Sequence, residues 1–128
     1  MDFKTLADQY RNELLDNVLP FWLEHSQDLE FGGYFSCLDR EGKVFDTDKF
    51  IWLQGREVWM FSMLYNKVEK RQEWLDCAVQ GGEFLKKYGH DGNYNWYFSL
   101  DRSGRPLVEP YNIFSYTFAT MAFGQLSL

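Results

Sequence analysis

Residues 34–42 of the chain read YFSCLDREG, and a copy that lacks the cysteine, YFSLDRSG, occupies residues 97–104. A stretch that recurs at such a distance indicates that the chain contains two copies of one structural unit. Both copies have the pattern of a β-hairpin, in which a short aromatic strand leads into an Asp-Arg-x-Gly turn and a second strand follows. The repeat therefore predicts two hairpins, one in each half of the chain.

The turns of these hairpins carry the same residue types at the same places. Gly42 and Gly104 are expected to adopt a left-handed backbone conformation, which glycine reaches without steric strain. The Asp-Arg pairs that begin at Asp39 and Asp101 are expected to be turn and surface residues.

Amphipathic helices are predicted ahead of both hairpins, over residues 3–22 and 72–88. In each segment the apolar side chains fall on one stripe of the helix, and the charged side chains lie away from it. Gly89 follows the second segment and is expected to close that helix. Helices of this kind bury one face only, so we interpret them as an outer layer.

The segments after the hairpins differ, because their apolar side chains point in nearly every direction. Residues 49–66 form the first such segment, with Asp48 as its predicted N-cap, and a second begins at about Asn112. Gly55 is expected to let another element pack closely against the first helix. We interpret both segments as helices of an enclosed inner layer.

The order outer helix, hairpin, inner helix occurs twice, in repeat units at about residues 1–66 and 67–128. This order describes two helical pairs of a double-layered α/α toroid. Two outer helices cannot shield two fully apolar inner helices from water, and repeat arrays usually need about three or more units for stability. We therefore expect that another portion of the protein supplies further pairs, or that copies of the chain associate.

Charge and hydropathy exclude several classes of function. The formal net charge is −6, and no run of Lys or Arg is present, which argues against a nucleic-acid or anionic-membrane surface. No stretch reaches the roughly 18 apolar residues of a membrane span, and the first residues have no apolar signal segment. A cytoplasmic protein is the simplest interpretation.

No cofactor or metal is predicted. Cys37 and Cys77 show no metal-type spacing with His25 or His90, and we expect both to be reduced, packed thiols. The sequence also has no glycine-rich phosphate loop.

Three segments resemble one known family: residues 32–35 (GGYF), residues 49–61 (KFIWLQGREVWMF), and residues 113–115 (IFS) followed by residues 121–124 (MAFG). They are similar to N-acylglucosamine 2-epimerases, or renin-binding proteins, and more distantly to cellobiose 2-epimerases and sulfoquinovose or mannose isomerases. The resemblance covers the whole chain but only about the first third of a family member. It implies an all-α fold with small β-hairpins, a partial (α/α)6 toroid with two of its six helical pairs.

The resemblance also implies a reaction, the reversible epimerisation at C2 of a ring-opened amino sugar or related aldose, most like N-acetylglucosamine to N-acetylmannosamine. This chemistry requires a base, an acid on the opposite face and donors for the enediolate charge. In the family, two histidines on later helices transfer the protons, and this sequence does not include those helices. His25, at the end of an outer helix, and His90, in a turn, are not expected to replace them, so the chain alone is expected to be catalytically incomplete.

Arg56 is the candidate site residue that stands out, since an arginine in an apolar helix must be paired or must face a polar cavity. From the residues alone, a structural ion pair and a binding role are evenly matched. The resemblance implies that Arg56 faces the substrate oxygens and stabilises the enediolate.

Two aromatic residues complete the candidate substrate site. Trp52 lies four residues before Arg56, hence on the same helical face, and either stacks on the sugar ring or belongs to the core. Phe114 stands where the disaccharide-acting relatives carry a tyrosine, which favours the N-acyl monosaccharide branch.

Two classes of function remain open. In the first, the chain is part of an epimerase that binds sugar weakly and needs a missing C-terminal portion for turnover. In the second, it is a non-catalytic protein-binding or self-assembly module, and animal members of the family that it resembles bind renin.

Overall fold

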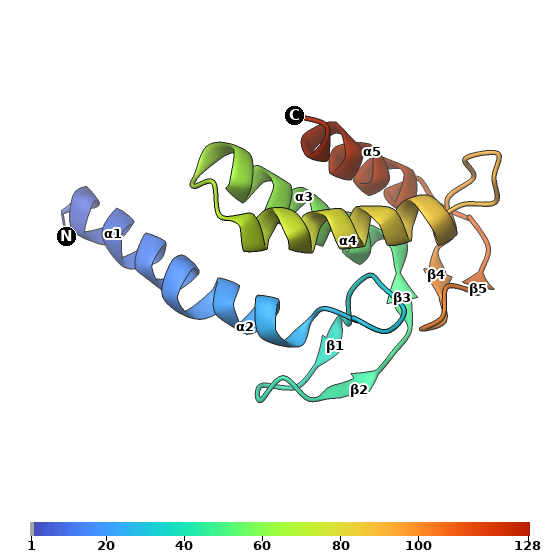
Figure 1. Cartoon of the computed structure of the whole chain (residues 1–128), viewed down its shortest axis with the longest axis horizontal. Helices are drawn as coiled ribbons and strands as arrows, with labels where there is room; N and C mark the ends of the chain where they lie inside the picture. The colour runs from blue at the N-terminus through green and yellow to red at the C-terminus, as the bar shows by residue number, and fades with distance from the viewer. Residues whose placement is uncertain (1) are drawn as a thin grey trace.

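The computed structural model describes residues 2–128. Helices pack along one another, and the β-strands lie beyond one end of them (Figure 1). In chain order the elements are α1 (Phe3–Glu13), the π-helical turn η1 (Leu14–Val18), α2 (Leu19–His25), β1 (Cys37–Leu38), β2 (Val44–Asp46), β3 (Lys49–Phe50), α3 (Ile51–Lys67), α4 (Gln72–Tyr88), β4 (Ser99–Leu100), β5 (Pro106–Val108) and α5 (Phe114–Leu126). The predicted class, all-α with small β-hairpins, is confirmed.

The first helix is continuous through α1, η1 and α2, since Leu14 and Leu19 at the two junctions keep right-handed helical backbone angles. Pro20 lies in the first turn of α2 and has no N–H with which to continue the hydrogen-bond ladder. The preceding turn widens to π geometry, as helices do where their ladder is interrupted. The predicted outer helix is confirmed and continues to His25.

Both predicted hairpins are present. β1 pairs with β2 and β4 pairs with β5, each antiparallel, and Gly42 and Gly104 in the turns have φ angles of 84° and 95°. β3 also pairs with β4, so the strand that leads into α3 belongs to the sheet of the second hairpin. This sheet joins the two repeated halves of the chain.

The two copies of the repeat align without a gap, which corrects the interpretation that the second copy lacks a residue. Cys37 and Ser99 begin the equivalent strands β1 and β4, and Tyr34 and Trp96 occupy the equivalent β-bridges ahead of them. The YFS segments of the two copies therefore do not occupy equivalent positions in the structure: they are shifted by one residue relative to each other. Strand pairing, and not residue identity, sets the register. The boundary between the repeat units, at about residue 66, stays a prediction.

Two glycines permit close packing around the helices. α3 packs against both α4 and α5, and a Cβ atom on Gly55 would lie 2.8 Å from the carbonyl oxygen of Phe118 on α5. The prediction for Gly55 is confirmed. Gly89 ends α4 as predicted, but its backbone is right-handed. Glycine is needed there because a Cβ atom would lie 2.7 Å from the ring of Trp96.

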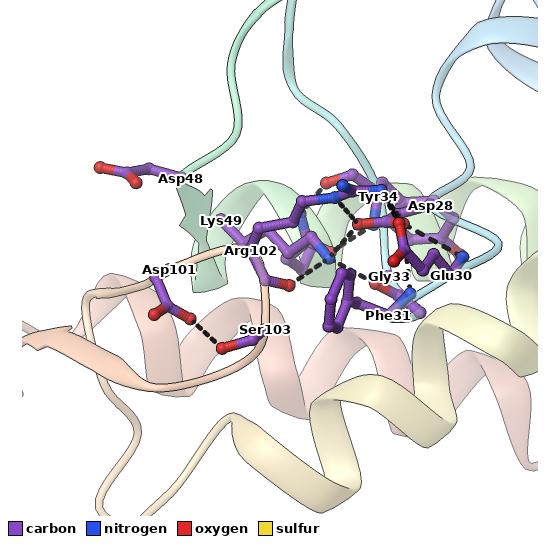
Figure 2. Close-up of polar contacts among 12 residues, drawn as sticks. Asp28, Glu30, Phe31, Gly33, Tyr34, Asp48, Lys49, Asp101, Arg102 and Ser103 are labelled. Atoms are coloured by element: carbon purple, nitrogen blue, oxygen red, sulfur yellow. Dashed lines mark hydrogen bonds and ion pairs between the residues drawn. The ribbon is translucent and has the colours of Figure 1, made fainter.

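The prediction that Asp48 caps α3 is wrong. The N-cap position belongs to Phe50 and has no side-chain capping bond, and Asp48 points away from the start of the helix (Figure 2). The sheet holds the first turn instead, since the backbone N–H of Ile51 donates to the carbonyl of Phe98 at 3.0 Å. A strand that leads directly into a helix supplies backbone acceptors, so a side-chain cap is unnecessary.

The core is one buried cluster to which α2, α3, α4 and α5 contribute. α1 buries none of its residues, and its N-terminal end stands away from α3 and α4 (Figure 1). Phe3 on α1 is 88% exposed, and Ile113 and Phe114 at the start of α5 are 72% and 61% exposed. Apolar side chains thus remain in water, as predicted for two pairs alone. Within residues 2–128, no helix has the length and hydropathy to cross a membrane.

Candidate functional site

Trp52 and Arg56 lie one turn apart on α3 and share a face, as predicted. The guanidinium carbon of Arg56 lies 5.8 Å from the centroid of the Trp52 ring and 5.9 Å from that of Phe118 on α5. These distances allow a favourable contact between the cation and the ring electrons. The two inner helices therefore present an arginine flanked by aromatic rings.

A cavity of about 320 Å³ opens next to this arginine and is lined by Trp52, Phe98, Phe114 and Phe118; we refer to it as the aromatic cavity. It brings together Trp52 and Phe114, two of the residues predicted to bind substrate. The sequence interpretation missed the other two. Phe118 follows Phe114 by one helical turn, and Phe98 lies in the second repeat of the hairpin, so periodicity and the repeat were the available signals.

Arg56 is exposed, which differs from the expectation of an enclosed helix. No side-chain hydrogen bond or ion pair of Arg56 is found among residues 2–128, so the structural ion pair that the sequence left open is not observed there. α4 and α5 make the main helix contacts of α3 and leave the Arg56 side of that helix partly exposed. A second cavity of about 310 Å³ lies on this side, lined by Trp22, Ser36, Leu53, Arg56, Glu57, Trp59 and Met60.

Glu57, the next residue on α3, is half-buried and lines this second cavity. Burial raises its pKa to about 8, although the hydrogen bond that it accepts from the Ser26 hydroxyl lowers it. The carboxyl group therefore binds its proton more tightly than that of an exposed glutamate. Sequence reasoning missed Glu57, although a second charged residue in an apolar helix was a signal of the same kind as Arg56.

A buried charge cluster fixes the start of α3 (Figure 2). Lys49 and Asp28 are fully buried, and the ammonium of Lys49 donates to Asp28 Oδ2 at 2.9 Å and to the carbonyl oxygens of Gly32 and Arg102 at 2.6 and 2.9 Å. Arg102 forms a two-point pair with Asp28, with Nε–Oδ2 at 2.9 Å and Nη2–Oδ1 at 3.0 Å. The cluster joins the loop after α2, the start of α3 and the turn of the second hairpin.

The electrostatics of this cluster follow from burial and pairing. Burial would raise the pKa of Asp28, but hydrogen bonds from Arg102, Lys49 and the Phe31 N–H outweigh it and lower the pKa to about 2. Burial lowers the pKa of Lys49, which Asp28 opposes. Arg102 is thus more than the surface residue that was expected, whereas Arg40, in the same place of the first turn, is exposed as predicted.

The two histidines lie where the sequence placed them. His25 ends α2 and packs under the hairpin turn at Gly42. His90 lies in the loop after α4, where its Nδ1 accepts from the Gly92 N–H at 3.0 Å and its ring stacks on Tyr94. Neither lines the aromatic cavity or the cavity beside Arg56. Within residues 2–128, no three His, Cys, Asp or Glu side chains are grouped to hold a metal ion.

Paired outer and inner helices with hairpins at one end define a portion of an (α/α) toroid, and its inner helices carry an arginine beside an aromatic cavity. The chain belongs to the N-acylglucosamine 2-epimerase family, whose sequence model matches residues 33–128. It is 49% identical to N-acylglucosamine 2-epimerase of Mus musculus over 116 residues, which is 88% of this chain and 28% of the mouse protein.

Disaccharide-acting relatives show the same fold. The chain is 30% identical to cellobiose 2-epimerase of Dictyoglomus turgidum over 120 residues, which is 92% of this chain and 30% of that protein. It superposes on the structure of cellobiose 2-epimerase from Bacillus thermoamylovorans with a TM-score of 0.86 and 30% identity, covering 96% of this chain and 32% of the other. The chain spans less than a third of the length of these relatives.

Proposed function

We propose that the chain is the substrate-binding N-terminal part of an amino-sugar 2-epimerase that interconverts N-acetylglucosamine and N-acetylmannosamine. The observation that carries the proposal is the position of Arg56, exposed and without an ion-pair partner among residues 2–128, beside the aromatic cavity. A cation that can bind oxygens next to aromatic rings suits a sugar, which presents hydroxyl groups and apolar C–H faces. The identity with the mouse N-acylglucosamine 2-epimerase supports the choice of sugar.

In the proposed reaction, a base removes the proton from C2 of the ring-opened sugar, and the electron pair moves onto the carbonyl oxygen of C1. An acid then returns a proton to the opposite face of C2, and the carbonyl re-forms. The guanidinium of Arg56 donates to the oxygen of C1 and stabilises its negative charge. Other parts of the complete protein supply the base and the acid, so the isolated chain binds sugar without turnover.

A hybrid enzyme tests this function. In it, the chain replaces the matching segment of the mouse protein, and conversion of N-acetylglucosamine to N-acetylmannosamine is followed. We expect turnover, and we expect Arg56→Ala to lower kcat by roughly 100-fold or more, the usual loss when a donor to a developing oxyanion is removed. Arg40→Ala, at an exposed arginine in the turn of the first hairpin, is the control and should leave kcat unchanged. Full activity of the Arg56→Ala hybrid would refute the role of Arg56.

Self-association is the second candidate, and the exposed apolar residues of α1 and α5 favour it. Light scattering during size-exclusion chromatography of the isolated chain distinguishes the two. A discrete oligomer that has no effect on amino sugars supports an assembly module. Turnover by the isolated chain would show instead that the missing portion is not needed for catalysis.

A further inference from the structure

We propose that the aromatic cavity formed by Trp52, Phe98, Phe114 and Phe118 receives the N-acyl group of the substrate and selects 2-acylamino sugars over sugars with a free hydroxyl at C2. This inference rests on the proposed function and adds the part of the substrate that the cavity recognises.

The lining of the cavity favours an apolar group. All four lining side chains are aromatic, and apart from the indole N–H of Trp52 they offer no hydrogen-bond donor or acceptor. A sugar hydroxyl buried there would lose its hydrogen bonds with water without replacement. The alkyl end of an N-acyl group is the apolar substituent of such a sugar, and it gains from the same burial.

The shape of the cavity also fits a compact group. The rings of Trp52 and Phe118 have centroids 6.0 Å apart and are inclined by 49°, so they form a wedge and not two parallel stacking faces. The ring of Phe98 is held from the side by Phe50 and Tyr111, with centroid distances of 5.7 and 4.9 Å. The Phe98 wall is therefore supported by its neighbours before any ligand binds.

The position of the cavity relative to Arg56 matches the order of groups in the sugar. The oxygen that takes the charge lies on C1, and the acylamino group lies on the adjacent carbon, C2. The guanidinium carbon of Arg56 lies 5.8 and 5.9 Å from two of the rings that line the cavity. A sugar whose C1 oxygen binds Arg56 can therefore place its C2 substituent in the cavity.

The volume of about 320 Å³ is larger than an acetyl group requires. Longer acyl chains should therefore enter, and each added methylene that is buried should strengthen binding roughly fourfold until the cavity is full. This dependence on chain length distinguishes an acyl site from a surface on which the sugar ring stacks.

The test uses saturation-transfer NMR on the isolated chain with N-acetyl-, N-propanoyl- and N-butanoylmannosamine. We expect the acyl protons to receive more saturation than the ring protons, and affinity to rise with chain length. Phe114→Ser, which places a polar group at the cavity wall, should remove both effects. Phe45→Ser, at a phenylalanine of β2 that is 71% exposed, is the matched control and should change neither. Saturation centred on the ring protons, or equal effects of the two variants, would overturn the acyl site.

The hybrid enzyme separates this inference from the proposed function. If the hybrid epimerises all three sugars and its kcat/KM does not depend on the acyl chain or on Phe114→Ser, the acyl site is wrong and the epimerase function stands. If the hybrid epimerises none of them, the proposed function fails, and the NMR result on the isolated chain decides the acyl site by itself.

Discussion

The two inner helices, α3 and α5, have similar apolar sequences and very different surroundings. α3 packs against α4 on one side and α5 on another, and α5 has α3 as its main neighbour. The buried residues of α3 are Ile51, Gln54, Gly55, Val58, Phe61, Ser62 and Leu64, and those of α5 are Ser115, Ala119 and Ala122. An apolar sequence therefore becomes core only where neighbouring elements cover it, and the uncovered side of these helices carries the candidate site.

The starts of the two helices differ as well. α3 begins from a strand held by the buried Asp28, Lys49 and Arg102 cluster, whereas at α5 the N–H of Phe114 donates to the side chain of Asn112 at 3.0 Å. α3 also carries the acidic or basic residues Arg56, Glu57 and Lys67, and α5 carries none. Single substitutions can test each of these differences separately.

The largest effect is expected when the anchor of α3 is removed. Asp28→Ala leaves the ammonium of Lys49 buried without its carboxylate, and loss of one partner of a buried pair typically lowers the free energy of unfolding by about 3–5 kcal/mol. Urea unfolding of the two proteins measures the difference. Arg40→Ala, at the exposed place in the other hairpin turn, should stay within about 0.5 kcal/mol. Similar losses of unfolding free energy in both variants would mean that the buried cluster does not stabilise the fold more than an exposed arginine does.

The next effect depends on pH and comes from Glu57. Its pKa rises from 4.5 unfolded to about 8 folded, so the folded state binds the extra proton between these values, and stability falls as pH rises through that window. The Glu57→Gln side chain cannot ionise. Between pH 5 and pH 8, the free energy of unfolding of this variant should therefore rise by roughly 3 kcal/mol relative to that of the wild type. Unfolding curves across this range provide the measurement. Parallel pH profiles for the two proteins would show that Glu57 ionises normally.

A smaller effect is expected where α3 and α5 approach each other. Gly55→Ala would place a methyl group 2.8 Å from the backbone oxygen of Phe118, which cannot move aside as a flexible side chain would. The helices must separate, and overpacking of this kind lowers the free energy of unfolding by about 1–3 kcal/mol. A thermal unfolding curve that matches the wild type would contradict the close approach.

The smallest effect should have the opposite sign and concerns the open side of α5. A Cβ atom on Gly124 would meet nothing within 4 Å. Gly124→Ala should therefore raise the free energy of unfolding by about 0.5–1 kcal/mol through helix propensity alone. Destabilisation would mean that another segment occupies the space beside α5. The Gly55→Ala and Gly124→Ala variants would then no longer distinguish the two helices.

Local patterns in the sequence predicted most of the fold. The periodicity of residues 3–22 and 72–88, the turn glycines Gly42 and Gly104, and the close packing at Gly55 all follow from short stretches of chain, and the structure confirms them. The Asp48 cap failed because β3 pairs with a strand from the other half of the chain. Such pairing has no local signature.

The candidate site was predicted in part for the same reason. Arg56 could be singled out because a charge in an apolar helix is conspicuous, and Trp52 because it lies one turn before Arg56. Phe114 was singled out only through the family resemblance. Phe98 reaches the aromatic cavity from the hairpin region; the repeat marked its segment, but the folded chain was needed to place it beside α3 and α5. Arg102 lies 74 residues from its partner Asp28, so nothing near either residue indicates the pair.

The partners of Lys49 also set an order of events during synthesis. Its ammonium donates to the carbonyl of Arg102, a residue that follows it by 53 positions. At about 5–20 residues per second, the ribosome needs roughly 3–10 s to add those residues. During this interval the first half of the chain has left the ribosome before β4, the partner of β3, has been made. The edge of β3 is then unpaired and accessible to a chaperone.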